Sequence, residues 1–156
     1  MSRRYLIIYA LVIGVIQVLM NNFLSLSRLV DISLLPLLVF CLPGKQQRPG
    51  YLPAAFLFGL AIDFASSGTV GITSCALLPC VFARPMILKD HPDEKKLSRD
   101  LILSITLLCA LYFLVYCLFD SAGTLKWNFL LLRWLCSTLV SAVICITLKV
   151  TAVKEI

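Results

Sequence analysis

The chain has 156 residues, of which 60% are hydrophobic and 14% are charged, and its mean hydropathy is +0.97. A soluble domain has about 25% charged residues, so this composition excludes an ordinary soluble domain and predicts a membrane protein. We expect one integral membrane domain over residues 1–156. The net charge of +6 does not indicate nucleic-acid binding, because the basic residues lie between apolar runs rather than in one patch.

Six apolar runs are separated by short polar segments. A helix needs about 20 apolar residues to cross hydrocarbon roughly 30 Å thick, and the first, fourth, fifth and sixth runs reach or approach that length. The second and third runs are short, and Pro36 interrupts the second. We therefore predict an all-α bundle of six transmembrane helices with two short spans, and a re-entrant hairpin is the alternative for the short pair. The runs are Tyr5–Met20, Ile32–Leu42, Tyr51–Ala65, Val70–Leu88, Leu101–Phe119 and Phe129–Leu148.

The distribution of basic residues predicts the topology. With six spans, 11 basic residues fall on one side of the membrane and 2 on the other, while Arg133 lies within the last span. Lys and Arg concentrate on the cytoplasmic side, so both termini and the loop Lys89–Arg99 are predicted to be cytoplasmic. The segments 66–69 and 121–126 then face outward. The first run is interpreted as an uncleaved helix, because Asn21-Asn22-Phe23 offers no small-residue cleavage site.

The residues that commonly carry chemistry form no catalytic pattern here. All seven cysteines lie in apolar runs, and no pair has the two-residue spacing of a zinc or redox motif. We interpret them as small residues that pack between helices. The sequence shows no nucleophile beside a base, no glycine-rich phosphate loop and no paired carboxylates within one span. We therefore predict a non-enzyme without a cofactor or metal site.

The most informative segment is Gly59-Leu-Ala-Ile-Asp63, which places a carboxylate near the end of the third run. Ala55, Gly59 and Asp63 recur every four residues, so they share a helix face on which small residues permit close approach of a neighbouring backbone. A charge at membrane depth costs roughly 2.5–3.5 kcal/mol and so needs a partner or a use. One expectation is an ion pair between Asp63 and Arg133, which lies about one turn into the last span from the same side. The alternatives are that Asp63 caps the next helix, binds the turn 66–69, or faces a partner or ligand.

Other polar residues fall on the same outer side. Asp31 and Asp120 lie beside short outer loops, and Gln17 lies at the outer end of the first span, on a face predicted to pack inward. We therefore expect a polar cluster in the outer half of the bundle. The candidate structural or partner-facing residues are Ala55, Gly59, Asp63, Gly71, Asp31 and Arg133.

A family resemblance is carried by three segments. The pattern Gly59-Leu-Ala-Ile-Asp63, then Gly68-Thr-Val-Gly71, then a long apolar helix ending Arg84-Pro-Met-Ile-Leu-Lys89 resembles the rod shape-determining protein MreD family. The resemblance extends over the whole chain and includes the size, the basic N-terminus and a short second span introduced by Asp31. The sequence departs from the family at Val30, where a proline is often found.

The resemblance implies a non-catalytic scaffold or regulator, in the bacterial inner membrane, of the complex that elongates the lateral cell wall. The implied partners are a bitopic MreC-like protein and, beyond it, MreB, RodA and the elongation-specific penicillin-binding protein. The family is also similar in fold to the substrate-binding subunits of energy-coupling-factor vitamin transporters, so a small-molecule-binding transport subunit is the alternative. That alternative predicts a polar cavity lined by several helices. The spans contain few polar side chains, which favours the scaffold.

Overall fold

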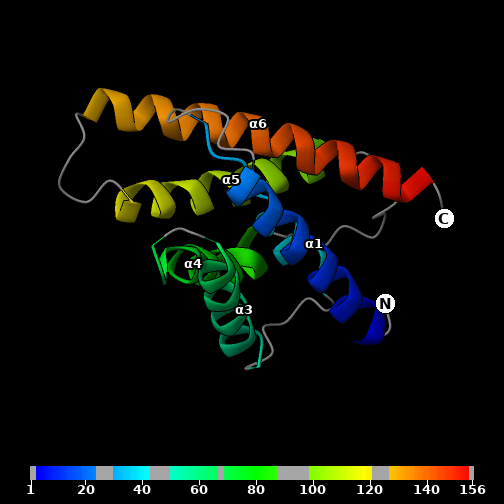
Figure 1. Cartoon of the computed structure of the whole chain (residues 1–156). Helices are drawn as coiled ribbons and strands as arrows, with labels where there is room; N and C mark the ends of the chain where they lie inside the picture. Colours follow the sequence, from blue (N-terminus) through cyan, green and yellow to red (C-terminus); the bar gives the residue numbers. More distant parts are fainter. Residues whose placement is uncertain are drawn as a thin grey trace.

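The computed structural model describes residues 3–23, 30–42, 50–66, 69–87, 99–120 and 127–154, and in these ranges the chain is all-α (Figure 1). Three predicted features lie wholly or partly outside the described ranges: the central part of the turn 66–69, the cytoplasmic loop before Arg99 and the outward loop 121–126.

Five of the six apolar runs form helices close to their predicted bounds. Apolar side chains occur on every face of these helices, which is typical of helices that are surrounded by other helices or by lipid. The third run matches its helix residue for residue. The helices are α1 Arg3–Phe23, α3 Tyr51–Ala65, α4 Ile72–Ile87, α5 Arg99–Asp120 and α6 Trp127–Lys154.

The second apolar run does not form a helix that is long enough by itself to span a membrane. Its only helix, α2 Leu35–Cys41, has 7 residues and is about 10 Å long, far short of the hydrocarbon thickness. Pro36 lies in the first turn of α2, where its missing N–H has no intrahelical partner to lose. Pro36 therefore begins this helix rather than interrupting it, and the residues 30–34 that precede α2 are non-helical.

Two stretches within the described ranges are long and apolar enough to cross a membrane, namely Leu101–Asp120 and Trp127–Lys149. Three further apolar helical stretches are shorter: Ile7–Asn22, Tyr51–Ala65 and Ile72–Ile87. The outer faces of the long helices are strongly apolar, since Leu103 and Leu139 are 65% and 61% exposed. Contiguous apolar surface of this kind is unusual on a soluble monomer.

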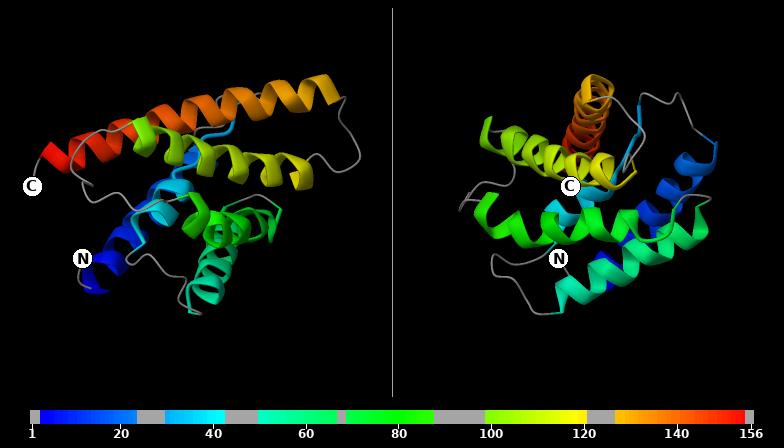
Figure 2. Two further views of the ribbon diagram at one scale, coloured as in Figure 1. Left: turned by 180° about the vertical axis from the view of Figure 1, so that it is seen from behind. Right: turned by 90° about the vertical axis from the view of Figure 1, so that its left-hand side faces the viewer.

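The helices are arranged around the short α2. Helices α5 and α6 lie side by side and run in opposite directions, and α3 packs against α4 (Figures 1 and 2). Helix α2 contacts α1, α4 and α5, and its residues Leu35 and Leu37 are at most 1% exposed. The start of α1 and the end of α6 lie on one side of the molecule, opposite the end of α5 and the start of α6 (Figure 1). This arrangement agrees with a topology in which both termini share one side.

The cysteines pack as the sequence predicts. Cys80, Cys109, Cys117 and Cys145 are fully buried between helices, and the seven cysteines, all of which lie in the described ranges, form no disulfide. Their role in this part of the molecule is to fill space where helix backbones approach closely.

Candidate functional site

The non-helical residues 30–34 are held in the core by side chains of α6. The backbone N–H of Asp31 donates to Ser137 Oγ at 3.0 Å, and the backbone N–H of Ser33 donates to Ser141 Oγ at 3.0 Å. Ser137 and Ser141 are four residues apart, so both hydroxyls project from one face of α6. They satisfy donors that a helix would otherwise satisfy with its own carbonyls.

Helix α1 completes the support through Gln17, which is only 3% exposed. Its Oε1 accepts from the backbone N–H of Leu34 at 2.8 Å, and its Nε2 donates to the carbonyl oxygen of Ile32 at 3.0 Å. Gly14, one turn earlier, lies against the Phe58 ring of α3. The predicted inward orientation of this α1 face is confirmed. Irregular backbone is tolerated at membrane depth when protein groups satisfy it in this way.

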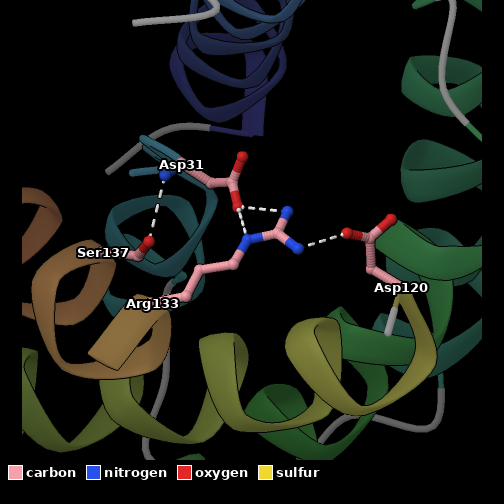
Figure 3. Close-up of polar contacts among 4 residues, drawn as sticks. All are labelled: Asp31, Asp120, Arg133 and Ser137. Carbon is pink, nitrogen blue, oxygen red and sulfur yellow. Dashed lines mark hydrogen bonds and ion pairs between the residues drawn. The ribbon is translucent and has the colours of Figure 1, made fainter. Parts of the chain in front are cut away.

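Arg133 of α6 binds two carboxylates at once (Figure 3). Its Nε and Nη2 lie 2.8 Å and 2.7 Å from Asp31 Oδ2, and its Nη1 lies 2.7 Å from Asp120 Oδ2. The arginine side chain is 12% exposed and the two carboxylates are about a third exposed. A guanidinium presents donors in a fixed planar fork, so one arginine joins the segment before α2 to the end of α5.

Burial raises the pKa of the Asp31 carboxyl above its ordinary value, and attraction to the Arg133 guanidinium opposes this rise without cancelling it. Asp31 precedes α2 and is not part of a helix.

The expected ion pair between Asp63 and Arg133 is wrong. Both residues lie in the described ranges, and the carboxylates there that lie within ion-pair distance of Arg133 are Asp31 and Asp120. The Asp63 carboxylate instead binds backbone N–H groups that follow it closely in the sequence. Its Oδ2 accepts from the backbone N–H groups of Gly71 at 2.8 Å and Thr73 at 3.1 Å.

The alternative interpretation of Asp63, as a cap of the next helix, is confirmed. A helix leaves its first N–H groups without intrahelical partners, and a carboxylate there also meets the positive end of the helix dipole. Gly71, which precedes α4, has φ of +100°, a conformation that L side chains rarely adopt. Asp63 of α3 thus caps α4 across a turn that ends in a positive-φ glycine.

The backbone of α4 approaches α3 closely at Gly59, which confirms the predicted close-contact face. A Cβ placed on Gly59 would lie 2.7 Å from Ser74 Cα and 2.8 Å from Ser74 N. The Ser74 hydroxyl donates to the Phe56 carbonyl oxygen at 3.0 Å across the same contact. Ala55, on the same face, is partly buried against the core. We call α3 and α4, joined at Gly59 and Asp63, the α3–α4 hairpin.

A cavity of about 200 Å³ lies between these parts of the site. It is bounded by the C-terminal ends of α1, α3 and α5, the start of α4 and the residues before α2. The polar and aromatic side chains that line it are those of Gln17, Asn21, Asp31, Ser33, Asp63, Ser66, Thr69, Thr73, Tyr112, Phe113, Tyr116 and Asp120. The expected polar cluster is therefore present, and its side chains surround this cavity.

Several contributors to this site were not predicted from the sequence. Asp120 was expected on the outer side but not as a partner of Arg133, and no role was predicted for the hydroxyls of Ser137 and Ser141. Their four-residue spacing on the same helix as Arg133 was the available signal. Tyr116 and its aromatic neighbours on α5 also line the cavity, but an aromatic residue that lines a cavity has the same sequence pattern as one that packs in a core.

No protein-family model matches the chain, and no curated protein or solved structure matches it. The assignment of function therefore depends on the residues of the chain and on the geometry described above.

Replacing Asp63 with alanine should destabilise the protein by about 1–2 kcal/mol, because the N–H groups of Gly71 and Thr73 lose their acceptor. Asp63→Asn keeps an acceptor oxygen and should lose much less. Thermal unfolding of the purified protein in detergent measures both. If Asn were as damaging as Ala, the negative charge rather than the hydrogen bonds would be the important property.

Proposed function

We propose that the chain is a multi-pass protein of a bacterial inner membrane, with both termini in the cytoplasm. Three observations support this. Two helices are long and apolar enough to span a membrane, and the outer helix faces are apolar. The distribution of basic residues is 11 to 2 when the run Ile32–Leu42 is counted as one of six crossings. Helices α3 and α4 are about 22–24 Å long and would match a locally thinned bilayer or extend through flanking residues.

We propose that this protein is a non-catalytic scaffold of the machinery that elongates the lateral cell wall. The α3–α4 hairpin is the observation that carries the proposal. The residues on which the resemblance to the MreD family rests, Gly59, Asp63 and Gly71, form one structural unit rather than a scattered set. Such a close helix pair offers a rigid face to a partner. The partners would be an MreC-like bitopic protein and, through it, MreB, RodA and the elongation-specific penicillin-binding protein.

Depletion of the protein from its bacterial host tests this proposal. Cells should become round and the elongation complex should disperse, because a scaffold positions synthases without doing chemistry. Cell width and the localisation of a fluorescent RodA fusion are the measurements, and re-expression of the intact chain is the control. Intact shape combined with a growth defect only under vitamin limitation would contradict the scaffold and support a transport subunit.

The cavity favours ligand binding as a second candidate function. The spans contain few polar side chains, which favours the scaffold, but several of these side chains line one cavity between α1, α3, α4 and α5. A concave site with a small number of convergent polar groups is the usual form of a small-molecule site. Ligand binding and scaffolding are compatible in one protein.

A further inference from the structure

The lining of the cavity carries an excess of negative charge. Asp31, Asp63 and Asp120 all contribute to it, and Arg133 reaches two of these carboxylates from α6. Within the described ranges, three formal negative charges therefore face one positive charge. An anionic ligand would have to overcome this field, whereas a cation would be attracted by it.

Asp63 provides an unused acceptor inside the cavity. The residue is only 4% exposed, and its Oδ2 accepts both amides at the start of α4. No residue in the described part of the chain donates to its second oxygen, Oδ1, although Asp63 lines the cavity. This oxygen is not sealed inside the protein, so a ligand or a water molecule in the cavity can donate a hydrogen bond to it.

Three aromatic side chains of α5, which we call the α5 aromatic wall, line the same cavity. The rings of Tyr112 and Phe113 meet edge to face with centroids 5.3 Å apart, and Tyr112 and Tyr116 are stacked at 6.0 Å. All three side chains line the cavity. The face of an aromatic ring attracts ammonium groups through its quadrupole, and a carboxylate combined with aromatic faces is the usual receptor for an organic cation.

We propose that this cavity binds a small organic ammonium ion, with the charged nitrogen between Asp63 and the α5 aromatic wall. The proposal rests on the second candidate function, ligand binding, and is independent of wall elongation. The cavity of about 200 Å³ holds roughly six or seven water molecules, which suits a small amine or the head group of an amino lipid. The acidic residues do not converge as a metal site in the described part of the chain.

Choline, its uncharged carbon isostere and the matching carboxylate anion test the ligand class, because the three probes have nearly the same shape. We expect choline to raise the midpoint of thermal unfolding of the full chain in detergent, and the other two probes at equal ionic strength to have little effect. Asp63→Asn, which keeps the cap, should weaken choline binding roughly tenfold or more, as measured by titration calorimetry. Tyr116→Leu should weaken binding in the same way, whereas Tyr116→Phe keeps the ring and should retain it.

The possible results distinguish the ammonium assignment from ligand binding in general. Stabilisation by the neutral or anionic probe, lost in Tyr116→Leu, would overturn the ammonium assignment and leave ligand binding standing. No effect of any probe on the intact chain, with no change in nanodiscs of phosphatidylethanolamine compared with phosphatidylglycerol, would overturn ligand binding itself. Stabilisation by phosphatidylethanolamine alone would identify a lipid head group as the source of the ammonium, and stabilisation by soluble choline would identify a free solute.

Discussion

Replacing Arg133 with alanine is expected to lower the free energy of unfolding by about 3 kcal/mol, because it leaves Asp31 and Asp120 without their shared counterion. The loss should lie at the lower end of the range for buried pairs, since these carboxylates are 32% and 30% exposed. Unfolding in mixed detergent micelles and the level of folded protein in membranes are the measurements. Arg99→Ala is a matched control, because Arg99 is exposed at the start of α5.

Removing the orphaned carboxylates should rescue the Arg133 variant. Asp31→Asn and Asp120→Asn, introduced together into Arg133→Ala, should recover much of the loss, since residues in one ion-pair network are not additive. Asp63→Ala, by contrast, should add its full effect to that of Arg133→Ala, because Asp63 belongs to the cap of α4. A stability of Arg133→Ala equal to that of Arg99→Ala would show that the network contributes nothing.

Replacing Gly59 with alanine is expected to destabilise the protein by about 3 kcal/mol, because one added methyl group meets backbone atoms of α4. The Cβ would lie 2.7 Å from Ser74 Cα, a contact that only a shift of the whole helix can relieve. The same unfolding measurement applies, and co-purification of an MreC-like partner would test whether the proposed scaffold surface of the hairpin is also lost.

Two further variants make the test of Gly59 specific. Gly50→Ala should be neutral or slightly stabilising, since nothing lies within 4 Å of its Cβ position and its φ of −76° suits alanine. Ser74→Gly should fail to rescue Gly59→Ala, because the clash is with the Cα and N atoms of Ser74 rather than with its hydroxyl alone. Full rescue would place the strain in the side chain and would contradict a backbone contact.

The sequence alone determined the properties that depend on neighbouring residues. Apolar runs predicted six helices, and five of them lie close to their predicted bounds, with α3 Tyr51–Ala65 correct at both ends. A helix is the simplest structure that satisfies main-chain hydrogen bonding in an apolar setting. The four-residue spacing of Ala55, Gly59 and Asp63 predicted a close helix contact, and the nearness of Asp63 to the next helix made capping one of the open interpretations.

Only the tertiary structure decided which distant groups meet. Charge and depth along the sequence predicted that Arg133 pairs with Asp63, but Arg133 pairs with Asp31 and Asp120. The carboxylate of Asp63 accepts the amides of Gly71 and Thr73 instead. The second apolar run became the short α2, because Gln17, Ser137 and Ser141 satisfy the backbone that precedes it. The cavity exists only where the ends of several helices converge, so hydropathy along one chain carries no signal for it.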